Sequence, residues 1–377
     1  MKKNKTPIII SCAVLAVIIM ILGIVFISSC LGNMNYMDYS DVEVTQHETA
    51  IDTTPEPEPI IEPEVVYNES TNPLTGLPTE EDITDNKPYA IVIGNSKTAI
   101  PQIGISKADI ICEVVAEGGI TRMLALYQDI SKVGTIGSIR SSQTYLIDIA
   151  QGYDALLFFA GGNPDAYSML SDRDDITYFD GLGSMRAEIF YIDQQRRDSM
   201  GYEHSMVTSG ELIVQRLPTY NTRLEHAEGY KSELSFVEDG TPEDGITAVD
   251  FIVTFEDSSK TTSFKYDTGD QLYYLSQHGS EYRDDDDNTQ VAVTNVLILK
   301  TSISDIPGDP SGRLDIKTTG HGSGYFICGG KYVEIDWLRT DYNSQFQYSL
   351  KDGSDLNLGQ GKTYVCIVSH SVEINLE

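Results

Sequence analysis

Acidic side chains that could do chemistry gather in one stretch that begins at Asp109. If residues 109–117 form an extended segment, alternation places Asp109, Glu113 and Glu117 on one side of it. Carboxylates aligned along an otherwise apolar strand can hold a divalent cation or act as a general acid or base. The pattern therefore predicts three candidate ligand-binding carboxylates.

Two arginines follow this stretch, and each comes shortly after a glycine. Arg122 follows Gly118-Gly119-Ile120-Thr121, and Arg140 follows Gly137-Ser138-Ile139. Glycine lets the backbone approach a partner closely, and a guanidinium binds a phosphate or carboxylate through two parallel hydrogen bonds. Two interpretations stay open. The arginines neutralise the neighbouring carboxylates as structural ion pairs, or they form an anion or metal site.

The remaining motifs for catalysis or cofactor binding are incomplete. Gly361-Lys362-Thr363 ends like a phosphate-binding loop, but Leu356 stands where the first glycine belongs. The histidines show no zinc-site spacing, and His204 is a candidate acid or base only if it reaches the same cleft as the arginines. The run Asp284-Asp285-Asp286-Asp287 lacks the glycine of a calcium loop, so we expect a solvated loop. We predict no metal site and no cofactor.

The composition excludes one class of partner. Lys and Arg number 26 against 57 Asp and Glu, which gives a net charge of −31. Such a surface repels phosphate backbones, so a general nucleic-acid binder is excluded. Charged residues make up 22% and hydrophobic residues 40%, which is close to ordinary globular usage. We therefore expect a folded body.

The amino end predicts attachment to a membrane. Three lysines precede an uncharged apolar run, residues 8–27, which as a helix would reach about 30 Å, the thickness of a bilayer's hydrocarbon core. Ile27-Ser28-Ser29-Cys30 resembles a lipoprotein cleavage box, in which Cys30 becomes the lipidated amino terminus. The anchor is therefore a lipid on Cys30 or an uncleaved helix over 8–27. Both place the body on the extracytoplasmic side of the cell membrane.

The chain divides into regions of different composition. Residues 31–70 carry repeated proline and unopposed carboxylates, which predict an extended linker. Predicted strands and helices alternate in the next region, whereas short strands and turns without a helix period follow it. We predict an α+β protein overall. A signal peptide or membrane anchor at 1–30 and an acidic linker at 31–70 precede an α/β domain at 71–220. A mainly antiparallel β domain follows at 240–377, as a sandwich or partly open barrel.

Three cysteines fall in the predicted body. Cys112, Cys328 and Cys366 all lie in apolar runs, which favours small buried side chains. Three thiols cannot build a disulfide framework. A bridge between Cys328 and Cys366 is possible only if their strands are neighbours.

Several separate motifs, occurring in one order, resemble the YerB-like lipoprotein family. They are Asn72–Pro78, Pro101–Asp109, Glu117–Arg122, Ile139–Ser141 and Tyr153–Ala155, with further matches at Asn295-Val296, Gly312-Arg313-Leu314, Gly353 and Gly361-Lys362-Thr363-Tyr364. The resemblance implies two domains and an envelope location. It implies no activity, because that family is a domain of unknown function.

Two positions depart from the YerB-like pattern. Where that family tends to show Arg-Ser-x-Arg, this chain ends the motif in Gln143, and a Pro-His-Asn segment is replaced by Glu203-His204-Ser205. If the second arginine were essential for a ligand, this chain would bind that ligand differently or not at all.

Two functions fit these observations. The first is a non-catalytic, envelope-associated binding or scaffold protein, whose partner is a cell-wall polymer or an envelope protein. The alternative is an extracytoplasmic enzyme for phosphorylated envelope glycopolymers or lipid carriers. In that enzyme Arg122 and Arg140 bind phosphate, and Asp109, Glu113 or Glu117 holds a divalent cation or acts as base.

Overall fold

The computed structural model describes residues 70–183, 187–255 and 260–376. The predicted anchor at 8–27, Cys30 and nearly all of the acidic linker lie outside these residues. Within the described ranges, none of the helices is long and apolar enough to cross a membrane.

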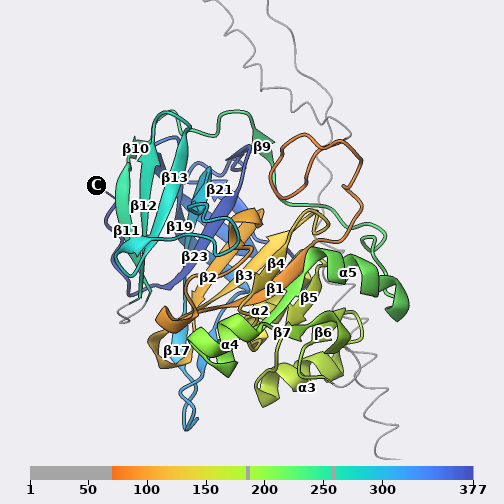
Figure 1. The fold of residues 1–377 in the computed structure, drawn as a ribbon. Coiled ribbons are helices and arrows are strands. Elements are labelled where there is room, and N and C mark those ends of the chain that lie inside the picture. Colours follow the sequence, from red (N-terminus) through yellow and green to blue (C-terminus); the bar gives the residue numbers. More distant parts are fainter. Residues whose placement is uncertain (1–69, 184–186, 256–259, 377) are drawn as a thin grey trace, which may run out of the picture. The chain divides into compact units, whose positions relative to one another are not determined.

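One eleven-stranded sheet dominates the body (Figure 1). Its main path runs β10-β20-β19-β16-β23-β2-β3-β1-β5-β6, and β21 pairs with β20. Both halves of the chain contribute, because β2 pairs in parallel with β23 from Ile110 opposite Thr363 to Val114 opposite Ile367. The strands are β1 (Tyr89–Asn95), β2 (Ile110–Val115), β3 (Thr121–Tyr127), β5 (Leu156–Phe159), β6 (Tyr178–Asp180), β10 (Ile246–Thr247), β16 (Asn295–Thr301), β19 (Gly320–Cys328), β20 (Lys331–Arg339), β21 (Gln347–Leu350) and β23 (Thr363–Ser369).

The central strands of this sheet are covered on both faces. Every residue of β2, β3 and β23 is buried, as expected for near-continuous apolar runs in a covered mixed sheet. On one face, Ile111 belongs to the same apolar cluster as Phe264 of a second sheet. On the other face, Cys112 shares a cluster with Leu146 of helix α2.

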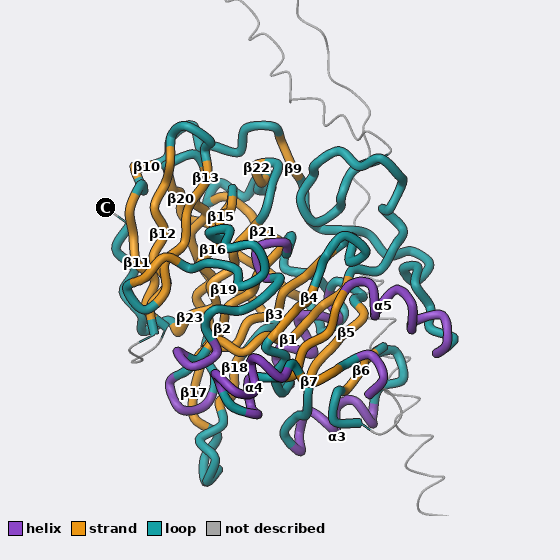
Figure 2. Tube along the Cα trace, viewed as in Figure 1, coloured by secondary structure: helices purple, strands orange, loops and turns teal. Residues whose placement is uncertain are grey.

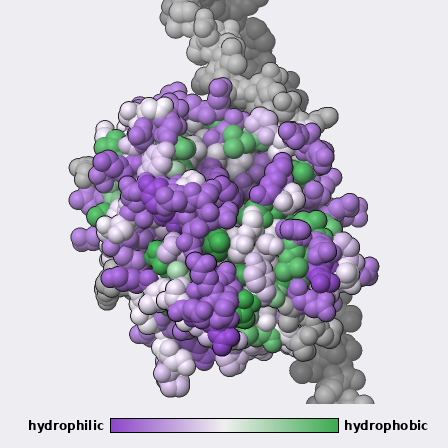
Figure 3. Space-filling view, in the orientation of Figure 1, coloured by the Kyte–Doolittle hydropathy of each residue, from purple (hydrophilic) through white to green (hydrophobic). Residues whose placement is uncertain are grey.

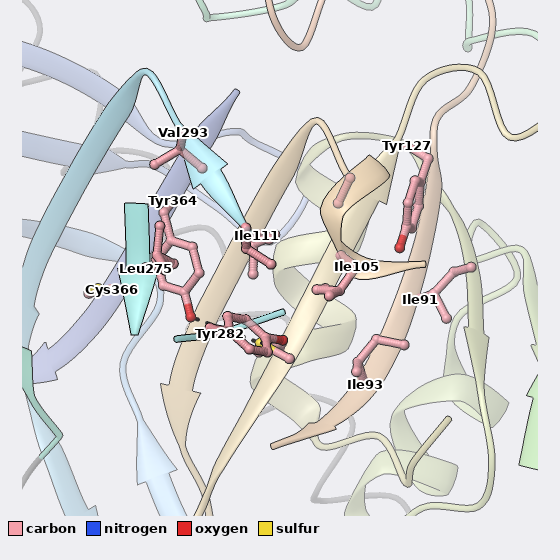
Figure 4. Packing of buried hydrophobic residues seen from close by; sticks show 14 of the residues in the cluster. Ile91, Ile93, Ile105, Ile111, Tyr127, Leu275, Tyr282, Val293, Tyr364 and Cys366 are labelled. Atoms are coloured by element: carbon pink, nitrogen blue, oxygen red, sulfur yellow. Dashed lines mark hydrogen bonds between the residues drawn. The ribbon is translucent and has the colours of Figure 1, made fainter. Parts of the chain in front are cut away.

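The second sheet is antiparallel and open. Its order is β11-β12-β13-β14, with β15 against β13, and its strands are β11 (Asp250–Thr254), β12 (Thr261–Asp267), β13 (Leu272–Gln277), β14 (Ser280–Glu281) and β15 (Ala292–Val293). The ring of Phe264 packs edge-on against Tyr364 of β23, with centroids 5.4 Å apart. Figure 4 shows Leu275 and Val293 packed beside Tyr364 and Ile111.

Helices are few, and strands and loops make up most of the described chain (Figure 2). The α-helices are α2 (Thr144–Gly152), α3 (Pro164–Asp172), α4 (Gln194–Met200) and α5 (Gly210–Arg216). Three helices have a side-chain N-cap, which satisfies a backbone N–H that has no partner within the helix. The caps are Asn163 for α3, Asp193 for α4 and Ser209 for α5.

Small sheets complete the body. They are β4 (Thr135–Gly137) with β8 (Met206–Ser209) and β7 (Tyr191–Ile192), then β17 (Ile303–Asp305) with β18 (Leu314–Ile316), and β9 (Phe236–Val237) with β22 (Leu358–Gly359). The face in Figure 3 is mainly hydrophilic, in keeping with the acidic composition.

The cysteines of the body are free thiols. Cys112, Cys328 and Cys366 are all buried, as their apolar surroundings predict. Cys328 lies on β19 and Cys366 on β23, and β16 separates these strands in the sheet order. The condition for a bridge, that the two strands be neighbours, is therefore not met.

Candidate functional site

Glu113 is enclosed between the two large sheets. Its side chain is 0% exposed and forms an ion pair with Lys260, whose Nζ lies 3.1 Å from Oε1. Burial by itself would raise the pKa of Glu113, but Lys260 and hydroxyl donors outweigh it and hold this pKa below its usual range. The neutral donors are Asn95 Nδ2 at 2.8 Å, Thr121 Oγ1 at 2.6 Å, Thr262 Oγ1 at 2.7 Å and Tyr364 OH at 2.6 Å.

Asp109 lies just before β2 and contacts a different part of the chain. Its carboxylate accepts hydrogen bonds from Asn72 Nδ2 at 3.1 Å and from the backbone N–H of Gln128 at 2.7 Å. Burial raises the pKa of Asp109 to about 6, against the lowering effect of the Gln128 bond and the Lys362 charge. Asp109 therefore anchors the motif that begins at Asn72.

Glu117 does not continue the strand. β2 ends at Val115, and Glu117 begins a short 3-10 helix, η3 (Glu117–Gly119). Its carboxylate binds Arg122 through two parallel hydrogen bonds of 3.0 and 3.1 Å, and Gln143 Nε2 donates to both oxygens at 3.1 and 3.2 Å. The prediction of three aligned carboxylates was thus wrong, since the structure separates Asp109, Glu113 and Glu117.

Arg140 forms a second ion pair close to the first. It binds the side chain of Glu203 and donates to the Glu203 carbonyl oxygen at 2.7 Å. Burial by itself would raise the pKa of Glu117. Its bond to Arg122 and the charges of Arg122 and Arg140 outweigh burial, so this pKa lies below its usual range. Arg140 and, more weakly, Arg122 also lower the pKa of Glu203. The two arginines and two carboxylates therefore form one patch, which we call the paired-charge site: Glu117, Arg122, Arg140 and Glu203.

His204 lies beside this site. Its Nε2 is 3.0 Å from Thr98 Oγ1, while Nδ1 is buried without a hydrogen-bond partner among the described residues. Burial lowers the pKa of His204, and the positive charge of Arg140 lowers it further. Both effects favour the neutral form of the imidazole.

A cavity of about 440 Å³ adjoins the paired-charge site. Glu117, Gln143 and Asn163 line it from one side, and Arg313 lines it from the loop between β17 and β18. The Asn163 amide donates to Gln143, and Arg313 pairs with Asp165 at 2.6 Å. Gln143 was missed as a site residue, although the sequence marks it as the position where a family arginine is replaced.

The acidic run at 284–287 is not a solvated loop throughout. Asp284 is only 1% exposed and accepts the backbone N–H groups of Gly104 and Ser106 at 2.8 and 2.7 Å. Asp285 pairs with the buried Arg196 at 2.8 Å. The run therefore fastens the second sheet's loop to the segment before β2. The carboxylate count alone did not reveal these partners.

Comparison with known proteins places the chain in a family. The family model described as "Protein of unknown function (DUF3048) N-terminal domain" matches residues 74–223, and the corresponding C-terminal domain matches 251–365. The protein named "Putative lipoprotein YerB" from Bacillus subtilis (strain 168) is 30% identical over 302 residues, covering 78% of this chain and 85% of that protein. The chain belongs to the YerB-like two-domain family. The resemblance seen in the sequence motifs is confirmed.

A solved structure of the same relative extends the match to three dimensions. The crystal structure of YerB protein from Bacillus subtilis superimposes with a TM-score of 0.68 at 29% identity, and the match covers 79% of this chain and 96% of that chain. The two domains of the YerB-like family are therefore present here. Strands of both domains join in the eleven-stranded sheet, because β2 and β23 pair directly.

Proposed function

We propose that this YerB-like protein is an anchored, extracytoplasmic lipoprotein that binds a cell-envelope partner without catalysing a reaction on it. The name of the B. subtilis relative and the Cys30 cleavage-box pattern support the anchor and the location. The partner is a cell-wall polymer or another envelope protein. No cofactor is needed for this role.

One observation carries the non-catalytic part of the proposal, namely that the candidate groups are already paired inside the molecule. Glu113 has no exposed surface. In the paired-charge site, each arginine holds a carboxylate, so the four groups sum to zero charge. A general base or phosphate clamp needs a group that reaches its substrate, and here the charges are directed at each other.

The test is capture by the full-length protein reconstituted in lipid nanodiscs. Purified cell-wall polymers and detergent-solubilised envelope proteins are offered over a range of salt concentrations. We expect saturable retention of one fraction, with that fraction released chemically unaltered. No saturable retention at any salt concentration would remove the binding role. Mass spectrometry of the mature amino terminus tests the lipid on Cys30 separately.

One feature favours the phosphate-handling enzyme as a second candidate. The Glu203 side chain is 70% exposed, so it can move away and leave Arg140 to an incoming anion. In this role Arg122 and Arg140 bind the phosphate, with Glu117 as base or cation ligand. Arg140→Ala should then abolish binding of a pyrophosphate lipid by the anchored protein. Equal binding by this variant and the parent, with unchanged circular dichroism, would eliminate the enzyme.

A further inference from the structure

A separate cavity of about 550 Å³ lies where the first described residues meet the connection between the two family domains. One wall is the Asn72-Pro73-Leu74 turn, and the opposite wall is the segment 225–236. In Figure 1 the segment after α5 runs beside the first described residues, and an isolated bridge between Asn86 and Glu225 joins the two. This cavity contains none of the paired-charge site.

The wall at 225–236 is held rigidly from behind. Asp154 accepts two hydrogen bonds of 3.0 Å from Arg223 and one of 3.0 Å from the backbone N–H of Ala227. The His226 ring stacks on Tyr230 with centroids 3.7 Å apart, and Gln345 donates to the Tyr230 hydroxyl at 2.6 Å. The cavity is therefore formed before any ligand arrives, which limits the entropic cost of binding.

Gln128 lines this cavity, and its side chain carries an acceptor without a partner. Its side chain is 3% exposed, and its Nε2 donates to the carbonyl oxygens of Ile83 at 3.0 Å and Asn86 at 2.7 Å. These two acceptors fix the orientation of the amide, because a flipped amide would place its own oxygen against both carbonyl oxygens. Oε1 is buried and has no hydrogen-bond partner among the described residues. Since buried polar atoms are nearly always satisfied, Oε1 calls for a donor from a ligand.

The charges around the cavity restrict that ligand further. Asp85, Glu225 and Glu228 line it together with the basic residues Lys231 and His226, of which His226 already faces Asp154. Within the described residues these three carboxylates make no side-chain hydrogen bond or ion pair. Leu74 and other apolar side chains cover part of the wall. An anion would be repelled, whereas a ligand with N–H donors, positive charge and a short hydrocarbon part satisfies all three features.

We propose that this cavity binds a primary ammonium group on a short aliphatic chain. The ammonium donates to Gln128 Oε1 and is balanced by the carboxylates of Asp85 and Glu228, while the methylene groups lie against Leu74. A free diamine and a lysine-type side chain in a peptide share this chemistry. The inference rests on the proposed binding role and gives that role a ligand class.

The experiment is calorimetric titration of the full-length protein in nanodiscs with three probes. They are diaminobutane, a lysyl dipeptide amide, and butanediol, which matches the first probe in shape but lacks charge. We expect saturable binding of at least one amine and none of butanediol. Binding of the dipeptide alone identifies a peptide source, and binding of diaminobutane alone identifies a free amine. Equal binding of butanediol, or no binding of either amine, overturns the inference.

Variants locate the binding within the cavity. Gln128→Met removes the acceptor but also breaks the bonds to Ile83 and Asn86. The two surface substitutions Asp85→Asn and Glu228→Gln are therefore the safer test. We expect each surface substitution to weaken amine binding by roughly two- to fivefold, the effect of one partly exposed ion pair. Glu243→Gln, an exposed carboxylate outside the cavity, is the matched control. Unchanged amine binding in the surface pair overturns the inference.

Failure here is distinguishable from failure of the proposed function. The Asp85→Asn/Glu228→Gln protein is also tested for capture of envelope fractions. If amines do not bind but envelope capture persists, the binding role stands and another surface carries it. If capture is also absent from the parent protein, the proposed function itself fails.

Discussion

Glu113 and Glu117 are close neighbours in the chain, and each is paired with a basic side chain, yet the two pairs differ in almost every physical respect. Glu113 on β2 is 0% exposed and Lys260, just before β12, is 2% exposed, so this pair joins the two large sheets. Glu117 is 30% exposed, and its partner Arg122 is 4% exposed near the start of β3. The same chemistry therefore occurs once in the interior and once at the surface.

The difference shows which pair is available for function. A buried pair is strongly coupled to folding, because removing one member leaves an uncompensated charge away from water. A partly exposed pair can exchange its carboxylate for another anion or for water at small cost. We therefore assign the Glu113 pair to holding the two family domains together and the Glu117 region to contact with partners.

The largest effect is expected from Glu113→Gln. The substitution leaves Lys260 charged and buried, so we expect the free energy of unfolding to fall by about 3–5 kcal/mol. Urea unfolding followed by circular dichroism measures it. The double variant Glu113→Gln/Lys260→Met removes both charges and should recover part of the loss. A single-variant loss below about 1 kcal/mol would contradict the assignment of this pair to domain joining.

A smaller loss is expected from Glu117→Gln at the surface. Arg122 then keeps a neutral acceptor, and the side chain at position 117 is 30% exposed to water, so the free energy of unfolding should fall by about 1–2 kcal/mol. The same urea series gives the comparison directly. If Glu117→Gln destabilised as much as Glu113→Gln, burial would not distinguish the two pairs.

Asp109 adds a pH-dependent member to the comparison. Because its folded pKa of about 6 lies above the usual 3.8, the folded state binds the proton more tightly than the unfolded state. Its contribution to stability is thus most favourable below pH 3.8 and is lost as the pH rises to about 6. We expect this loss to be on the order of 1 kcal/mol, allowing for partial solvent screening. Asp109→Asn should flatten the unfolding free energy between these pH values. An unchanged pH slope would rule out Asp109 as its source.

The sequence indicated a strand-rich body of two domains, but not the pairing of its charges. Strands over β2, β3 and β23 follow from apolar runs that only a covered sheet can accommodate. That β2 lies beside β23 does not follow, because no local signal links segments so far apart in the chain. For the same reason the Lys260 partner of Glu113 was missed. The predicted domain boundaries and the anchor stay predictions.

At the candidate site, sequence reasoning singled out Arg122 and Arg140 but found only part of their contacts, and their role stays a prediction. The interpretation that arginines neutralise nearby carboxylates agrees with the Arg122 and Glu117 contact. The partner of Arg140 could not be foreseen, since Glu203 comes from another segment and meets Arg140 only in the folded chain. The two departures from the family pattern were the available signal, because Gln143 contacts Glu117 and Glu203 contacts Arg140 in the paired-charge site.

These two departures give the smallest effect on stability and the sharpest test of function. Gln143→Arg with Glu203→Pro restores two residue types of the YerB-like pattern. The change adds one positive charge and removes one negative charge, so the net charge of the site rises by two. Proline is tolerated early in a short helix such as η5 (Tyr202–His204). Gln143 is buried, but an arginine there can still donate to Glu117, so we expect the free energy of unfolding to fall by less than about 1 kcal/mol. Freed from the Glu203 carboxylate, Arg140 should then bind a pyrophosphate lipid more tightly than in the parent protein. Flotation of nanodiscs containing that lipid measures the gain, and Glu203→Gln, which removes the charge without proline, is the control. If the double variant remains folded but gains no pyrophosphate binding, the local charge of this site does not decide its ligand. The contrast between the interior pair and the surface pair would then concern stability alone.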